Sequence, residues 1–229
     1  MKLYKVGGCV RDIFLGMPSK DIDYAVEASS FDQMRQEMID KGFNIFLETP
    51  QFLTIRAKYP NSKMVADFVL CRKESGSTDS RHPDLVEPGT IFDDLQRRDF
   101  TMNAIAECDE TGNIIDPHGG ILDLRQKLLR AVGNAEDRFN EDSLRILRAI
   151  RFSITKDLTI HTDIWQAFEK IDPRKLASVS TDRKREELNK MFAADSLKSL
   201  RLIGELPDEL QDAIFSDGKV WLKATTENK

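Results

Sequence analysis

The sequence predicts an α+β protein in which a mixed α/β head is followed by an all-helical second half. Two observations support this prediction. From Lys2 to about Val132, short apolar runs typical of strands alternate with shorter helical patterns. From about Asn134 onward, apolar residues recur three or four positions apart, which is the spacing of amphipathic helices. The sequence therefore predicts two domains, residues 1–132 and residues 133–229.

The head is expected to contain short strands around one longer helix. Ser30 is a candidate N-cap for a helix from Phe31 to about Lys41, because its hydroxyl can accept a backbone N–H. The polar stretch from Glu74 to Gly89 is rich in Gly, Pro and Ser, which predicts a long functional or disordered loop. Strands are predicted over Lys2 to Val6, over Ile22 to Val26, and over Phe52 to Tyr59 and Lys63 to Cys71, the last two joined by a turn at Pro60 to Ser62.

Composition and charge exclude several classes of protein. The net charge of −5 argues against a general nucleic-acid coating protein, so any contact with nucleic acid is expected to be local. The chain has three cysteines, Cys9, Cys71 and Cys108. Their odd number and wide spacing predict neither a disulfide framework nor a zinc site, and they favour a location in the cytoplasm. The N-terminus lacks the apolar run of a signal peptide, and no segment is apolar over a membrane-spanning length.

A glycine pair is the first functional signal. Gly7 and Gly8 follow a predicted strand and precede a helix, where backbone N–H groups can approach a ligand phosphate closely. Arg11 lies within one turn of them. A glycine pair alone is commonly just a turn, so this signal gains weight only in combination with other motifs.

Two carboxylates come next in the chain. Asp21 and Asp23 are two residues apart in a predicted strand, and side chains at that spacing point to the same face. Two carboxylates on one face invite a divalent cation, and Mg²⁺ favours a few carboxylates supplemented by substrate phosphates and water. A lone pair of this kind is also common at solvated strand edges. The ordered combination of glycine pair, arginine and carboxylates is far more specific.

A second motif, DDLQRRDFTMNAIA, carries Arg97, Arg98 and Asp99 directly before an apolar stretch that contains Asn103. A guanidinium near a triphosphate would neutralise and orient it, because arginine makes planar bidentate contacts with phosphate oxygens. Alternatively, Arg98 and Asp99 form a surface ion pair that contributes little.

A third motif, NEDSLRILRAIRF, is predicted to open a helix with acidic residues in its first turn. Arg145, Arg148 and Arg151 recur every three residues and form a stripe that winds around the helix. On a purely structural interpretation, Glu141 and Arg145 are a stabilising i,i+4 pair. On a functional interpretation, an Asp142 acceptor beside an Arg145 donor matches the Watson–Crick edge of cytosine or adenine and not that of guanine or uracil.

These motifs, in this order, resemble those of the class II tRNA nucleotidyltransferases and the bacterial poly(A) polymerases from Lys2 to about Phe152. The resemblance implies a polymerase-β-like nucleotidyltransferase head, a helical neck, bound Mg²⁺, CTP and ATP as substrates, and a tRNA or other RNA 3′ end as acceptor. It also implies that Asp79 to Pro83 belongs to a flexible loop and that DPHGGILDLRQKLLR is a hinge. The implied roles are catalysis and metal binding by Asp21 and Asp23, and nucleotide binding by Gly7, Gly8, Arg11, Arg98, Asp99, Asp142, Arg145, Arg148 and Arg151.

Several alternatives stay open at this point. The chain is expected to lack the body and tail domains of longer relatives, and its three histidines offer no phosphohydrolase motif. Asp67 lies in a predicted strand, either as a third catalytic carboxylate or as an ordinary strand-edge residue. Within the enzyme class, the chain could add CCA, only CC, only A, or poly(A). Outside it, the chain could be an idle RNA-binding module or could modify a substrate other than tRNA.

Overall fold

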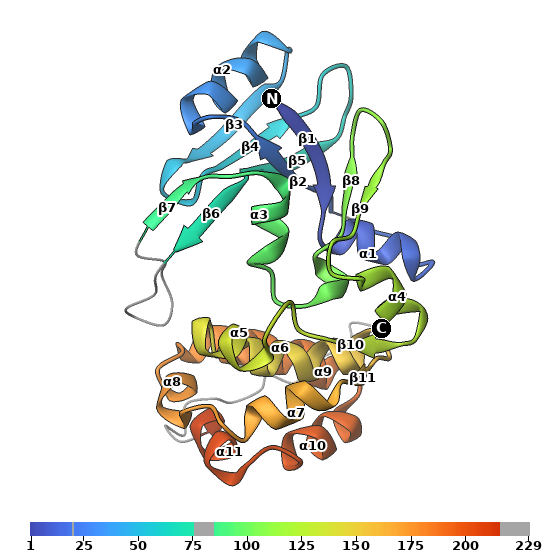
Figure 1. Ribbon diagram of the computed structural model, residues 1–229, viewed down its shortest axis with the longest axis vertical. Coiled ribbons are helices and arrows are strands. Elements are labelled where there is room, and N and C mark those ends of the chain that lie inside the picture. Colours follow the sequence, from blue (N-terminus) through green and yellow to red (C-terminus); the bar gives the residue numbers. More distant parts are fainter. Residues whose placement is uncertain (20, 76–84, 216–229) are drawn as a thin grey trace, which may run out of the picture. The chain divides into compact units, whose positions relative to one another are not determined.

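The computed structural model describes residues 1–19, 21–75 and 85–215 (Figure 1). These residues form two compact units, one ending at Leu124 and one beginning at Arg125. By this division residues 125–132, which the sequence analysis placed in the head, belong to the second unit. The physical reason is backbone pairing, because β10 (Leu128–Leu129) pairs in parallel with β11 (Thr159–Ile160).

The first unit is built on a seven-stranded mixed sheet in the order β3-β4-β5-β2-β1-β8-β9. Neighbouring strands run antiparallel except β2 and β5, which are parallel. The four predicted strands are confirmed as β1, β2, β4 and β5, with β2 beginning one residue later than expected and with β4 and β5 shorter at both ends; β3, β8 and β9 were not predicted. The strands are β1 (Lys2–Val6), β2 (Asp23–Glu27), β3 (Asn44–Thr49), β4 (Thr54–Lys58), β5 (Val65–Leu70), β8 (Ala106–Cys108) and β9 (Ile114–Ile115).

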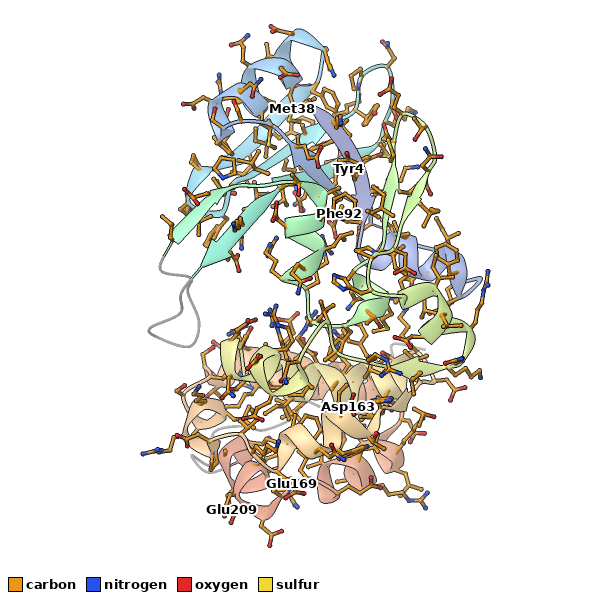
Figure 2. All side chains as sticks on the ribbon, in the orientation of Figure 1. Tyr4, Met38, Phe92, Asp163, Glu169 and Glu209 are labelled. Carbon is orange, nitrogen blue, oxygen red and sulfur yellow. The ribbon has the colours of Figure 1, made fainter. Side chains whose placement is uncertain are left out.

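One face of this sheet forms the core of the head. Alternate residues of β2, β4 and β5, among them Tyr24, Ile55 and Phe68, are fully buried on that face. Helix α2 (Phe31–Asp40) covers the same face through Met34 and Met38, the second of which is labelled in Figure 2. The predicted N-cap is confirmed, because the Ser30 side chain accepts a hydrogen bond from the Gln33 backbone N–H at 3.0 Å.

The remaining elements of the head lie around the sheet edges and the opposite face. The expected loop from Glu74 to Gly89 is partly regular, because its ends belong to an antiparallel pair, β6 (Arg72–Ser75) and β7 (Leu85–Pro88). The predicted flexible segment, Asp79 to Pro83, lies outside the described residues. The helices are α1 (Gly8–Phe14), α3 (Ile91–Gln96) and α4 (Gly120–Arg125), with short 3₁₀ turns η1 (Pro50–Phe52) and η2 (Thr101–Asn103).

In its described residues, the second unit has helices and the two-residue strands β10 and β11. Asn140 and Glu141 do not open the arginine-rich helix, as the sequence suggested; they end the helix before it. The chain is extended at Asp142, whose carboxylate accepts the Leu144 backbone N–H and so begins a new helix. The helices are α5 (Ala135–Glu141), α6 (Leu144–Thr155), α7 (Thr162–Phe168), α8 (Pro173–Ala177), α9 (Thr181–Ala194), α10 (Ser196–Gly204) and α11 (Asp208–Phe215). Within the described part of the chain, no helix is both long and apolar enough to span a bilayer.

Gly120 provides a direct test of the packing within the head. It opens α4, and a Cβ built on it would lie 2.1 Å from the Thr101 carbonyl oxygen. Because backbone must then move, Gly120→Ala is expected to lower the free energy of unfolding of the head by about 3 kcal/mol. All three tyrosines precede Leu124 and both tryptophans follow it, so urea unfolding monitored by tyrosine circular dichroism and by tryptophan fluorescence separates the two units. Gly204→Ala, which meets open space, is the matched control and should leave both transitions in place.

Candidate active site

The two predicted metal-binding carboxylates lie at one end of β2. Asp23 is the first residue of that strand and Asp21 precedes it by two positions. Backbone pairing places Asp23 between Val6 of β1 and Asp67 of β5. Partial burial raises the pKa of Asp23, the charges of Asp67 and Asp21 raise it further, and Arg98 opposes these effects. A negative charge is therefore concentrated at this point of the sheet, where a cation is favoured.

The glycine pair lies directly after β1, the other neighbour of β2. Gly7 has a φ of +71°, a conformation that side chains rarely adopt, and precedes the first turn of α1. A Cβ at Gly7 would lie 3.0 Å from Arg98 Nη1, and a Cβ at Gly8 would lie 3.4 Å from Arg11 Nη2. The absent side chains thus let two guanidinium groups approach the backbone, which forms a cationic turn beside Asp23.

Asp94 holds the arginine pair of the second motif in place. Its carboxylate is 2% exposed and accepts hydrogen bonds from Arg98 Nη2 at 2.8 Å and Arg97 Nε at 3.1 Å. Burial alone opposes its ionisation, but the Arg98 and Arg97 charges outweigh burial and lower the pKa of Asp94. Arg98 Nη1 also donates to the Asn103 carbonyl at 3.2 Å, which fixes the guanidinium over Gly7.

Asp99 and Arg11 belong to a buried hydrogen-bonded chain centred on Asn103. The Asn103 amide donates to Asp99 Oδ1 at 3.0 Å, and its side-chain oxygen accepts from Arg11 Nη1 at 2.7 Å. Arg11 also pairs with Asp12 at 2.8 Å, and the Phe100 backbone N–H donates to Asp99. Both predicted nucleotide contacts are only 7% exposed. Their observed partners tie α1 to η2 and thereby support the glycine turn.

In the second unit, Asp142 and Arg145 lie at the start of α6, and each has its own partner. Asp142 Oδ2 accepts from Arg183 Nη2 of α9 at 2.8 Å. Arg145 Nη1 donates to Glu141 at 2.8 Å and to the Arg138 carbonyl at 3.0 Å. The i,i+4 pair of the structural interpretation is therefore present. Asp142 and Arg145 remain adjacent, because the Arg145 backbone N–H donates to the Asp142 carbonyl at 3.0 Å.

The rest of the arginine stripe faces one buried acid on α9. Glu187 is 5% exposed, pairs with Arg151, and lies 3.8 Å from Arg148 Nη1. The Arg151 guanidinium also covers the Phe152 ring, 3.9 Å from its centroid. Sequence reasoning named neither Glu187 nor Arg183, yet Glu187 faces Arg148 and Arg151, and Arg183 pairs with Asp142.

The structure thus gathers Asp21, Asp23, Gly7, Gly8 and Arg98 into one region of the head. In the second unit it places Asp142 just before α6, and Arg145, Arg148 and Arg151 lie along that helix. Sequence reasoning also missed Asp94, the anchor of Arg98. A signal for it existed, because Asp94 precedes Arg97 and Arg98 by three and four residues, the spacing of helical ion pairs.

Known proteins are similar to this chain in sequence and in fold. A CCA-adding enzyme from Streptococcus pyogenes is 37% identical over 194 residues, which covers 83% of this chain and 46% of that protein. The Bacillus stearothermophilus CCA-adding enzyme in complex with CTP superposes with a TM-score of 0.77 and 31% identity, over 93% of this chain and 49% of that one. The Thermotoga maritima CCA-adding enzyme complexed with tRNA superposes with a TM-score of 0.72 and 28% identity, over 97% and 50%.

The chain therefore spans about half the length of the relatives it matches. Residues 3–130, more than half of the chain, match the sequence profile of the poly A polymerase head domain. This stretch contains the glycine turn, the carboxylate pair and the arginine pair described above. The chain belongs to the poly A polymerase head domain family.

Proposed function

We propose that this protein transfers nucleotides from CTP and ATP to the 3′ end of a tRNA, with release of pyrophosphate. The observation that carries the proposal is the position of the Arg98 guanidinium over Gly7, close enough to Asp23 for its charge to oppose the rise in the pKa of that carboxyl. This arrangement puts a phosphate-binding turn beside a carboxylate pair. The names of its relatives, CCA-adding enzymes with structures in complex with CTP and tRNA, support the same function.

The carboxylates fit Mg²⁺ as the cofactor. No three Asp, Glu, His or Cys side chains of the described residues form a complete metal-binding cluster. Mg²⁺ does not need such a cluster in enzymes of this kind, because it binds one or two carboxylates and completes its shell with substrate phosphates and water. Asp21 and Asp23 would hold it, and the repulsion that raises the pKa of Asp23 would be relieved. When bound, Mg²⁺ activates the attacking hydroxyl and stabilises charge on the transferred phosphate.

The chain's own residues account for the other requirements of the reaction. Backbone N–H groups at Gly7 and Gly8 bind triphosphate oxygens, and Arg98 neutralises charge that builds up on the leaving pyrophosphate. Asp94 keeps Arg98 aimed at this position, because its buried carboxylate is bonded to the guanidinium. Asp99, Asn103 and the buried Arg11 stiffen the turn from behind, which preserves the geometry during transfer.

An extension assay tests this function. The protein is incubated with Mg²⁺, with each NTP alone and with CTP plus ATP, using tRNA transcripts that end before CCA, after C and after CC. Stepwise addition that stops at CCA is the expected result. A long A ladder would identify a poly(A) polymerase, and addition of only C or only A a partial enzyme. Failure to extend any transcript would overturn the proposal and favour a different acceptor or an idle fold.

We further propose that Asp142 and Arg145 select the incoming base. Arg145→Ala is expected to reduce the preference for CTP and ATP over UTP and GTP about tenfold or more, since a bidentate base contact contributes ~1–3 kcal/mol of discrimination. The rate of transfer with the favoured nucleotide should change less. The measurement is kcat/KM for all four nucleotides, with Arg201→Ala, an exposed arginine of α10, as the control. Unchanged base preference in Arg145→Ala would remove this role.

We propose that the protein is located in the cytoplasm, and the state of its cysteines is consistent with that location. Cys9 and Cys71 are buried and Cys108 is partly exposed, and all three carry free thiols. Burial raises the pKa of the Cys71 and Cys9 thiols, so neither is a reactive thiolate at neutral pH. A chain with buried free thiols suits a reducing compartment.

A further inference from the structure

A cavity of the head lies on the sheet face opposite to Asp23. Its volume is about 720 Å³, which is within the range of small-molecule binding sites. Leu3, one of the lining residues, is paired with Val26, and the ring of Tyr59, another, has its centroid 5.9 Å from that of Tyr24. Val26 and Tyr24 both belong to the core beneath α2. Side chains alternate along β2, so Tyr24 and Asp23 point to opposite faces and the sheet separates the cavity from the carboxylate pair.

The cavity is present because α2 covers only part of this face. The buried core beneath α2 is formed by residues of β2, β4 and β5 together with Phe43, and Leu3 of β1 is only partly buried against it. The cavity lies beyond this core, beside β1 and the hairpin of β8 and β9, which forms the other edge of the sheet (Figure 1). Apolar surface on this half of the face is therefore accessible to a ligand.

Two aromatic and two aliphatic side chains are among the lining residues. The Tyr59 and Phe43 rings meet edge to face, with their centroids 4.9 Å apart, and Leu3 and Pro60 add aliphatic surface. Aromatic rings pack favourably against other rings in stacked or edge-to-face arrangements. A flat apolar molecule therefore fits this part of the cavity.

Asp109 brings a carboxylate to the same wall, and two tyrosines satisfy it. Its oxygens accept hydrogen bonds from the Tyr24 hydroxyl at 3.2 Å and from the Tyr59 hydroxyl. Burial raises the pKa of Tyr59 to about 12, and the contact with Asp109 adds to this effect, so the hydroxyl keeps its proton and donates at neutral pH. Because the protein itself binds this carboxylate, Asp109 does not require a cationic ligand.

The accessible charges of the cavity favour an anion. Lys2 and Lys41 are exposed lining residues, and among the described residues no carboxylate pairs with either of them. The amino group of Met1, which also lines the cavity, is already paired with Glu37. Glu110 is an exposed acid of the same lining and opposes the two lysines in part. Two accessible cations thus face one accessible carboxylate.

We propose that this cavity binds a small anion with a flat aromatic body, such as an aromatic carboxylate or sulfonate. The ring lies against Tyr59 and Phe43, and the acidic group lies near Lys2 and Lys41. This site is separate from the one proposed for nucleotide transfer, because the sheet lies between the cavity and Asp23.

Cys108 provides a reporter in the wall of the cavity. Its thiol is partly exposed, whereas Cys9 and Cys71 are buried. Hydrogen bonds from the Thr111 side chain and backbone lower the pKa of Cys108, so this thiol should react with an alkylating reagent faster than the other two. A ligand in the cavity should therefore slow the alkylation of Cys108.

The test uses anilinonaphthalene sulfonate (ANS), an aromatic sulfonate that binds accessible apolar surface. The full chain is titrated with ANS and its fluorescence is measured. In parallel, alkylation of Cys108 by iodoacetamide is followed by mass spectrometry with and without ANS. We expect one saturable site, and alkylation of Cys108 should slow as ANS occupies it.

Charge variants test which class of ligand the cavity takes. Lys2→Gln/Lys41→Gln is expected to raise the Kd for ANS about two- to fivefold for each lysine, the effect of losing one exposed ionic contact. Glu110→Gln is expected to lower the Kd, because it removes an opposing charge. Lys170→Gln/Lys190→Gln makes the same change in net charge as the first variant on exposed lysines of the second unit, and it should keep the wild-type Kd.

Three results would each overturn the proposal. They are an unchanged Kd in the Lys2→Gln/Lys41→Gln variant, an equal change in the control variant, and alkylation of Cys108 at the same rate when ANS is bound. Tyrosine circular dichroism confirms that each variant is folded, since all three tyrosines belong to the head. The measurements need neither nucleotide nor RNA, so their outcome does not depend on whether the protein extends a tRNA.

Discussion

Asp23→Asn is expected to reduce nucleotide transfer about 10³-fold or more while the protein stays folded. The substitution removes one of two carboxylates that would hold the catalytic cation, and loss of that cation's charge stabilisation costs several kcal/mol of the activation barrier. Asparagine keeps the size of the side chain, so packing is preserved. The measurement is kcat/KM for CTP with a tRNA transcript ending after C.

The stability of this variant provides a second readout. The charge of Asp23 is disfavoured in the folded protein by burial, Asp67 and Asp21. A neutral side chain should therefore leave the free energy of unfolding of the head unchanged or slightly higher. Asp40→Asn, at the exposed end of α2, makes the same charge change on a helix that packs on the opposite, buried face of the sheet, and should retain transfer. Transfer at the wild-type rate by Asp23→Asn would refute the assignment of the catalytic site.

Local patterns predicted the elements of this fold well where side chains themselves decide the structure. The Ser30 cap, the β1 strand and the amphipathic α6 helix each arise from a short sequence signal. Strand β3 escaped because its apolar residues are mostly exposed at a sheet edge and show no regular alternation. The break between α5 and α6 escaped because it depends on one carboxylate, that of Asp142, which takes over a backbone N–H.

The candidate site shows the same limit of sequence reasoning. The sequence motifs identified the groups that would contact a ligand, such as Gly7 and Arg98, because glycines and arginines are typical of phosphate-binding sites. Asp94, which holds Arg98, is a local partner, but other partners come from elsewhere in the chain: Arg183 reaches Asp142 across 41 residues, and Arg56 meets Asp67 only through strand pairing. Such partners depend on tertiary structure and leave no signal at short range.

Asp94→Asn is expected to destabilise the head and weaken nucleotide binding together. It removes a carboxylate that is 2% exposed and bonded to both Arg97 and Arg98. Breaking a buried ion pair by deleting one partner leaves the other charges uncompensated, so the free energy of unfolding should fall by about 2–4 kcal/mol at pH 7. Arg98 loses its anchor at the same time, which should raise the KM for CTP.

The pH dependence of this effect has a definite sign. The arginines lower the pKa of Asp94 in the folded protein below that of an unfolded aspartate, about 3.9. The carboxylate therefore contributes its full stabilisation above about pH 5 and loses it as the pH falls through the folded pKa. The difference in unfolding free energy between wild type and Asp94→Asn should be constant from about pH 7 to pH 5 and shrink in stronger acid. A difference that grows in acid would contradict the ion-pair assignment.

Asp93→Asn separates this effect from ordinary helix capping. Asp93 is the adjacent residue of the same helix, and its carboxylate accepts the Thr90 backbone N–H at 2.8 Å. Loss of such a cap costs about 1 kcal/mol. Within the described residues Arg98 donates to Asp94 and not to Asp93, so the Asp93 variant should leave the KM for CTP unchanged. If Asp93→Asn and Asp94→Asn raised the KM for CTP equally, the effect would come from the stability of α3 as a whole. That result would contradict a specific role of Asp94 in holding Arg98 over Gly7.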